Sequence, residues 1–214
     1  MNKKFLNFLK LPFHEKYQYI FLKIHSYFLR EQFKKCGKKL SIGKDSFIRG
    51  RGNLSVGNYF KAGRGLWLES VIGFNSTIGS IVVGNNFICG NNVHIGAANY
   101  VSIGNNVLIG SNVLIIDHAH GVYSGGVQDS PRTSPMDRKI FSDRGIVIGD
   151  NVLISDGVSI LSGVNIGDGV VVGCNSVVTH DLPSNSLAYG IPAKVHKSYN
   201  FLLSSWEANN TIIK

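Results

Sequence analysis

Aliphatic residues recur every six positions through the second half of the chain. The longest unbroken series is Ile148, Ile154, Ile160, Ile166, Val172 and Val178, and a second follows four residues later in the same units, at Val152, Val158, Val164 and Val170. A period of six fits neither an α-helix nor the simple alternation of one strand. It predicts a short strand and a turn, repeated so that each aliphatic residue stacks on its equivalent in the next coil.

The residues between the aliphatic positions support the same structure. Gly, Asn and Asp recur there, as in Asn105-Asn106, Asp150-Asn151 and Asp168-Gly169. These residues suit tight turns, where a positive φ is often needed. The chain holds 25 Gly but only 5 Pro, which favours many regular turns over a disordered segment. With three hexads to a coil, the pattern predicts an all-β fold, a parallel β-helix over residues 41–197.

The repeat is interrupted in three places. Its register slips between residues 57 and 72 and again near 97–101, which predicts irregular early coils. From 117 to about 145 the repeat stops, and the segment is polar and rich in turn residues. A long loop extruded from a regular solenoid is a typical location for functional residues.

The N-terminal segment has a different pattern. Over residues 15–35, Tyr and Phe alternate with Ile at largely helical spacing, which predicts a helix within a basic amphipathic arm of residues 1–40. The arm carries ten of the 22 Lys and Arg residues against Glu15 and Glu31, so it accounts for +8 of the net charge of +9. One interpretation is a cap over the first coil. The other is peripheral contact with an anionic membrane.

The remaining features narrow the class of protein. The rest of the chain is nearly neutral, which gives no support for nucleic-acid binding. Cys36, Cys89 and Cys174 lack metal-ligand spacing, and there is neither a signal peptide nor a membrane-spanning run. We therefore expect a cytoplasmic protein, peripheral at the inner membrane face if the arm binds lipid. Residues 198–214 are expected to form a C-terminal tail, with a short helix from Phe201 to Trp206.

Several stretches resemble the hexapeptide-repeat acetyltransferases. They are the repeats themselves, the loop that begins DHAHG, and the closing stretch VVTHDLPSNSLAYGIPAKV. The chain is most similar to the maltose/galactoside-type and polysaccharide O-acetyltransferases. This resemblance implies a left-handed β-helix, a homotrimer with active sites between subunits, and acetyl-CoA bound along the groove between neighbouring β-helices. It also implies a His general base from the extruded loop.

The resemblance points to individual residues. With the repeat register extended from Ile103 through Ile115, it implies His120 as the base, with His118 orienting it or contacting the acceptor and Asp117 as a hydrogen-bond partner. An irregularity of one hexad at the start of the loop would make His118 the base instead. It places the CoA contacts at Asp156, Cys174, Thr179, His180 and Lys194, and acceptor contacts at Asn91 and Asn92. The chain departs from the family where Leu153 replaces a frequent Trp, Cys174-Asn175 a usual Ala-Gly and His180 a usual Lys.

The chemistry suits a His base independently of the resemblance. A sugar hydroxyl is a weak nucleophile at neutral pH, and imidazole is a suitable base there, contributing about 10²–10⁴-fold. Because a thioester is already activated, the reaction needs neither a metal nor a covalent enzyme intermediate. Backbone N–H groups can stabilise the oxyanion.

Three other functions fit parts of the sequence. The first is an amino-sugar N-acetyltransferase, since a base serves an amine acceptor equally well. The second is a γ-type carbonic anhydrase, with zinc held by His94, His118 and His120 across a subunit boundary. The third is a scaffold without catalytic activity, which leaves the loop histidines unexplained.

Overall fold

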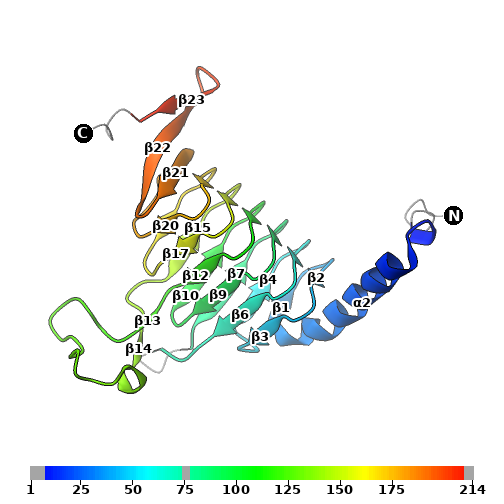
Figure 1. Ribbon diagram of the computed structural model, residues 1–214, viewed down its shortest axis with the longest axis horizontal. Helices are drawn as coiled ribbons and strands as arrows, with labels where there is room; N and C mark the ends of the chain where they lie inside the picture. Colours follow the sequence, from blue (N-terminus) through cyan, green and yellow to red (C-terminus); the bar gives the residue numbers. More distant parts are fainter. Residues whose placement is uncertain (1–7, 74–77, 210–214) are drawn as a thin grey trace.

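A computed structural model describes residues 8–73 and 78–209 of the chain. These residues form a β-helix in which each coil contributes one strand to each of three parallel sheets (Figure 1). Sheet A contains β1 (Lys35–Cys36), β4 (Leu54–Val56), β7 (Ser80–Val83), β10 (Tyr100–Ile103), β15 (Ile146–Ile148) and β18 (Asn165–Ile166). Sheet C contains β3 (Phe47–Arg49), β6 (Trp67–Ser70), β9 (His94–Ala97), β12 (Leu114–Ile116), β17 (Ser159–Ile160) and β20 (Val177–Val178).

In each coil the chain passes from sheet A through sheet B to sheet C. Sheet B contains β2 (Ser41–Ile42), β5 (Lys61–Ala62), β8 (Ile88–Cys89), β11 (Leu108–Ile109), β16 (Leu153–Ile154) and β19 (Val171–Val172). It continues into β21 (Ser186–Gly190), β22 (Ala193–Asn200) and β23 (Ser205–Ala208), of which β21 and β22 pair antiparallel, as do β22 and β23. The expected β-helix fold is confirmed.

The core is the interior of the coil stack. Residues eighteen apart in sequence pair in register, as Ile148 does with Ile166 and Ile160 with Val178. All four side chains are fully buried. The hexad series therefore form internal columns, because stacking aliphatic side chains from coil to coil removes a continuous apolar surface from water.

Asparagine and aspartate hold the turns together from coil to coil. The side-chain oxygen of Asn105 accepts a hydrogen bond from the backbone N–H of Asn85 at 2.9 Å, and Asp168 accepts one from Asp150 at 2.7 Å. Asn106 and Asn151 have φ of 56° and 58°, the left-handed conformation that Asn tolerates better than most residues. The polar turn residues thus satisfy backbone donors that the short strands leave unpaired.

The three corners of the coil differ in regularity. Four residues join sheet A to sheet B in every coil, and four join sheet B to sheet C. The connection from sheet C back to sheet A, which we call the C–A corner, varies from the two residues 98–99 to the 29 residues 117–145. The predicted slip near 97–101 and the extruded loop thus fall at one corner, because residues added there leave the other two columns of turns undisturbed. The slip predicted between 57 and 72 reaches this corner only at its end, since residues 57–70 form regular strands and turns.

The loop of residues 117–145 leaves the C–A corner as a projection at one side of the β-helix (Figure 1). At its base, β13 (Ala119–His120) pairs antiparallel with β14 (Ile140–Phe141). A single 3₁₀ turn, η2 (Pro135–Asp137), lies between them. The chain rejoins sheet A at Ile146, which pairs with Val101 of the preceding coil. The loop therefore inserts into the solenoid without shifting its register.

Helix α2 (Phe13–Leu29) precedes the coils and continues into the 3₁₀ turn η1 (Arg30–Gln32). The expected helix over 15–35 ends early, because Phe33 is extended and buried in the first coil. The side chain of Ser26 accepts a hydrogen bond from the backbone N–H of Ile42 at 2.9 Å. From there α2 runs away from the β-helix (Figure 1), and Phe13 is 86% exposed. Residues 1–7 of the expected arm lie outside the described residues.

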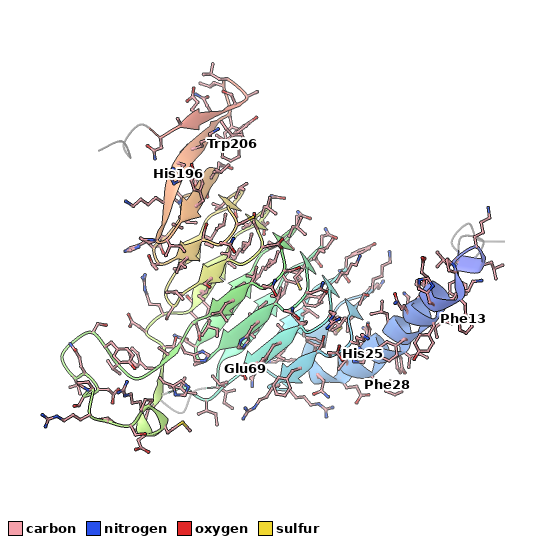
Figure 2. The ribbon with its side chains drawn as sticks, viewed as in Figure 1. Phe13, His25, Phe28, Glu69, His196 and Trp206 are labelled. Atoms are coloured by element: carbon pink, nitrogen blue, oxygen red, sulfur yellow. The ribbon has the colours of Figure 1, made fainter. Side chains whose placement is uncertain are left out.

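The expected helix from Phe201 to Trp206 is wrong. Residues 201–204 form a turn between β22 and β23, and the ring of Tyr199 lies 5.3 Å from that of Trp206 across the hairpin. Cross-strand pairing of aromatic residues stabilises such a ribbon. Figure 2 shows Trp206 and His196 on this hairpin, at the opposite end of the coil stack from Phe13 and Phe28. The last five residues of the expected tail lie outside the described part of the chain.

Candidate active site

Asp117 is the buried charge at the C–A corner. Its side chain is completely inaccessible to solvent and accepts hydrogen bonds from the backbone N–H groups of Ala98 at 2.7 Å and Asn99 at 2.9 Å. Ala98 and Asn99 are the two residues that join β9 to β10, where the sequence pattern slips. The short connection thus presents two backbone donors that compensate the carboxylate for its lost hydration.

His118 is oriented by this carboxylate. Its Nδ1 lies 3.0 Å from Oδ1 of Asp117, and its side chain is 10% exposed. An ionised carboxylate can only accept hydrogen bonds, so the network assigns the hydrogen to Nδ1 and leaves the lone pair on Nε2. A His in this tautomer, held by a carboxylate and reached by solvent, is arranged to accept a proton from a bound molecule.

A second histidine–carboxylate pair lies next to the first. Nε2 of His94 lies 3.1 Å from Oε1 of Glu69, and the ring of Trp67 stacks on the imidazole with centroids 4.5 Å apart. The sequence pattern pointed to His94 only as a zinc ligand and gave no sign of Trp67 or Glu69. The register that brings them together spans the irregular segment between β6 and β7, so regular hexad spacing could not reveal it.

His120, the expected base, lies two residues further along on β13. It is exposed and pairs with Ile140, and its carbonyl oxygen accepts a hydrogen bond from the hydroxyl of Tyr123. In the structure, therefore, it is His118 that contacts Asp117, at the corner where the loop leaves the coil.

The five expected CoA contacts lie at separate places in one chain. Asp156 and Cys174 are exposed at the corner between sheets B and C, where Asp156 accepts a hydrogen bond from the backbone N–H of Ser111. Thr179 and His180, whose side chains lie 2.7 Å apart, follow β20 at the C–A corner. Lys194 is exposed on β22. A single chain does not unite these residues in one pocket.

The two expected acceptor contacts occupy turn positions. Asn91 accepts a hydrogen bond from the backbone N–H of Arg64 at 2.9 Å, and Asn92, with φ of 54°, donates to Asn112 at 3.1 Å. Both lie at the corner between sheets B and C, at the other end of β9 from Asp117. Asn91 also lines a groove beside α2, together with Lys61. Within one chain these residues therefore lie apart from His118.

Two other kinds of site are absent from residues 8–73 and 78–209. These residues contain no group of three or more His, Cys, Asp or Glu side chains arranged to hold a metal ion. They also contain no helix long and apolar enough to cross a membrane.

Comparison with known proteins identifies the family. A family model described as bacterial transferase hexapeptide (six repeats) matches residues 145–180, and one described as hexapeptide repeat of succinyl-transferase matches residues 100–122. An Escherichia coli K12 protein named "Putative lipopolysaccharide biosynthesis O-acetyl transferase WbbJ" is 37% identical over 161 residues, which are 75% of this chain and 80% of that protein. The chain belongs to the hexapeptide-repeat acetyltransferase family.

Solved structures with this fold include other acyltransferases. AntD, an N-acyltransferase from Bacillus cereus in complex with dTDP and 3-hydroxybutyryl-CoA, matches with a TM-score of 0.68 at 19% identity, over 84% of this chain and 90% of that one. The hexapeptide-repeat acetyltransferase VCA0836 from Vibrio cholerae matches with a TM-score of 0.54 at 26% identity, over 84% and 81%. For this hexapeptide-repeat acetyltransferase, the AntD match supports the fold alone.

Proposed function

We propose that this hexapeptide-repeat acetyltransferase transfers an acetyl group from acetyl-CoA to a sugar hydroxyl of a saccharide or cell-surface polysaccharide precursor. The observation that carries the proposal is the bond between Nδ1 of His118 and the buried carboxylate of Asp117. It holds the imidazole in the tautomer in which Nε2 is free to accept a proton. We therefore assign the base to His118, in place of His120.

The reaction follows from this arrangement. Nε2 of His118 takes the proton of the acceptor hydroxyl as its oxygen attacks the thioester carbonyl. The new C–O bond forms, the C–S bond breaks, and the imidazolium returns its proton to the CoA thiolate. Asp117 stabilises the imidazolium between these steps, and the N–H groups of Ala98 and Asn99 hold Asp117 in place.

A hydroxyl acceptor is favoured over an amine by the relative. The E. coli protein that is 37% identical carries a name that includes O-acetyl transferase and lipopolysaccharide biosynthesis. An amino-sugar acceptor would give an acetamide in place of an acetyl ester. Hydroxylamine cleaves the ester and leaves the acetamide intact. Loss of label when hydroxylamine is added to the product made from radiolabelled acetyl-CoA would therefore identify a hydroxyl acceptor.

A homotrimer with sites between subunits completes the proposal. Of the residues assigned to CoA, Asp156 and Cys174 lie at the corner between sheets B and C, whereas His118 lies at the C–A corner. A neighbouring subunit is therefore needed to bring that part of the CoA site to the base. Ile88, Leu108 and Leu153 stack in register on the outer face of sheet B as a half-exposed aliphatic stripe. Burying such a stripe between copies removes apolar surface from water.

The basic arm is proposed to contact an anionic membrane, where a lipid-linked acceptor would be presented. Its support is the exposure of Phe13 and Tyr17 on α2 beside Lys10 and Lys16. Flotation with vesicles of anionic phospholipid tests this contact. A Lys10→Glu, Lys16→Glu and Lys23→Glu variant that floats as well as the wild type would contradict it.

The proposed reaction is tested by following free thiol release from acetyl-CoA with a panel of sugars and nucleotide sugars. His118→Ala is expected to lower kcat by about 10²–10⁴-fold with CoA binding retained by calorimetry. His120→Ala, two residues away and exposed, is the matched variant and is expected to change kcat by less than about tenfold. A larger loss in His120→Ala would return the base to His120, and no CoA binding by the wild type would overturn the acetyltransferase proposal.

A further inference from the structure

The outer face of sheet C carries two columns of functional side chains beside the C–A corner. Register pairing places Phe47, Trp67 and His94 in one column and Arg49, Glu69 and Gly96 in the next. Figure 2 shows Glu69 on this face of the coil stack. The columns lie directly before the corner that holds Asp117 and His118.

The first column is an aromatic surface open to solvent. The rings of Phe47 and Trp67 meet edge to face with centroids 5.4 Å apart, and the two residues are 48% and 44% exposed. His94 lies on the other side of Trp67 from Phe47, and its imidazole stacks on the Trp67 ring at an interplanar angle of 20°. Large aromatic side chains left half exposed next to a polar pair are typical of a binding surface.

The polar pair beside this surface, Glu69 and His94, has polar atoms that can still form hydrogen bonds. The side chains of Glu69 and His94 are 14% and 24% exposed, and they join through Oε1 and Nε2 at 3.1 Å. Among residues 8–73 and 78–209, no group bonds the second carboxylate oxygen of Glu69 or Nδ1 of His94. A half-buried carboxylate that keeps a free oxygen suits a ligand that donates hydrogen bonds, such as a hydroxyl group.

A buried glycine lies between this pair and the proposed base. The point that a Cβ on Gly96 would occupy lies 3.6 Å from Nε2 of His94 and 3.3 Å from Cε1 of His118. Both imidazoles therefore lie beside the same buried glycine. A side chain at position 96 would crowd them, because even its Cβ would meet His118 at less than the usual contact distance.

We propose that this surface, formed by Phe47, Trp67, Glu69 and His94, binds the sugar ring of the acceptor. The C–H face of a pyranose stacks on Trp67, and ring hydroxyls donate to the free oxygen of Glu69. A neighbouring hydroxyl then reaches Nε2 of His118, whose ring, like that of His94, lies beside Gly96. This assignment rests on the proposed function and names the part of the site that selects a sugar ring as acceptor.

Steady-state kinetics tests the assignment, with methyl glycosides of glucose, galactose and N-acetylglucosamine as probes. Trp67→Ala and Glu69→Gln are expected to raise KM for the sugar at least tenfold and to leave KM for acetyl-CoA unchanged. Trp206→Ala, which removes the only other tryptophan at the far hairpin, is the matched control and is expected to leave both constants unchanged. A wild-type KM for the sugar in folded Trp67→Ala would overturn the assignment while leaving His118 as the base.

Sugar binding can also be measured directly, without turnover and without a variant that lacks Trp67. The Trp206→Phe variant retains the whole surface and has Trp67 as its single tryptophan. Titration with the same glycosides is expected to change its fluorescence saturably, and Glu69→Gln in this background is expected to weaken the binding at least tenfold. Saturable binding without acetyl transfer would support the sugar surface and contradict the proposed function. Turnover of a glycoside with no fluorescence change at saturating sugar would contradict the surface alone.

Discussion

Nδ1 of His118 lies 3.0 Å from Oδ1 of Asp117, and the same carboxylate is held by backbone N–H groups of the preceding coil. Asp117 and His118 are adjacent in sequence, but their side chains are held in this orientation because Ala98 and Asn99 bond the carboxylate. Ser162, in the coil that follows, donates its hydroxyl hydrogen to the carbonyl oxygen of Asp117 at 2.6 Å. The pair is thus fixed from both neighbouring coils.

Asp117→Asn is expected to impair both catalysis and stability. The amide keeps the shape of the side chain, but its NH₂ group only donates, so at least one of the three donors now on the carboxylate loses its acceptor. We expect kcat to fall at least tenfold, because the imidazolium loses its counter-charge, and the free energy of unfolding to fall by about 1–3 kcal/mol. Thiol-release kinetics and urea denaturation measure the two effects.

Asp129→Asn is the control for that substitution. Asp129 accepts a hydrogen bond from the backbone N–H of Val122 at 2.8 Å, within the loop and away from the coil stack. It is expected to leave kcat within about twofold of the wild type, as for a surface substitution. If Asp117→Asn and Asp129→Asn lowered kcat equally, the loss would come from a disturbed loop and not from the bond between Asp117 and His118.

The three cysteines are expected to differ in reactivity. Burial raises the pKa of Cys89 to about 12, and burial also raises the pKa of Cys36, whereas Cys174 is exposed. Thiolate is the reactive form, so at pH 8 Cys89 has almost none available and is also shielded. Iodoacetamide labelling of the native protein, read by mass spectrometry, should modify Cys174 and leave Cys89 unmodified.

Labelling in the presence of acetyl-CoA tests whether Cys174 lies in the CoA site. If Cys174 contacts CoA, as the family resemblance implies, saturating acetyl-CoA should slow its alkylation at least fivefold. Denatured protein, in which all three thiols react, is the control for labelling efficiency. Rapid labelling of Cys89 in the native state would contradict the closed interior of the coil stack.

Gly104→Ala is expected to destabilise the stack. A Cβ at this position would lie 2.3 Å from Oδ1 of Asp150 and 2.7 Å from the backbone of Gly149, so the next coil would have to move. We expect a loss of about 1–3 kcal/mol in the free energy of unfolding, as for overpacking. Gly126→Ala, in the loop with no atom within 4 Å of the new Cβ, is the matched substitution and should cost little. Equal melting temperatures for the two variants would contradict the close packing of the turns.

Leu108→Lys tests the proposed trimer. Leu108 is the central residue of the aliphatic stripe on sheet B, between Ile88 and Leu153. A charge placed there would have to be buried between subunits, which is costly, so light scattering after size exclusion should show a monomer. Val82→Lys, a similarly exposed position on sheet A, should leave the oligomer intact. A wild type that is itself monomeric would refute the trimer directly.

The sequence by itself determined the β-helix, its internal columns and the position of the long loop. Each depends on a local rule that repeats: one aliphatic residue in every six, and a turn residue between them. The stacking of Ile154 on Val172 follows from counting eighteen residues, because the coil between them is regular. The same rule shows where the repeat stops at Asp117.

Only the tertiary structure decided which side chains meet at the C–A corner. The separation between stacked residues changes from 18 to 20, 27 or 45 where the chain adds residues at this corner, and no local pattern reports how an irregular connection folds. The family resemblance, carried along the repeat register, therefore favoured His120, and the hexad pattern overlooked Trp67 and Glu69. Their contacts with His94, and that of His118 with Asp117, arise from the path of the chain through the corner, which depends on backbone hydrogen bonds between coils.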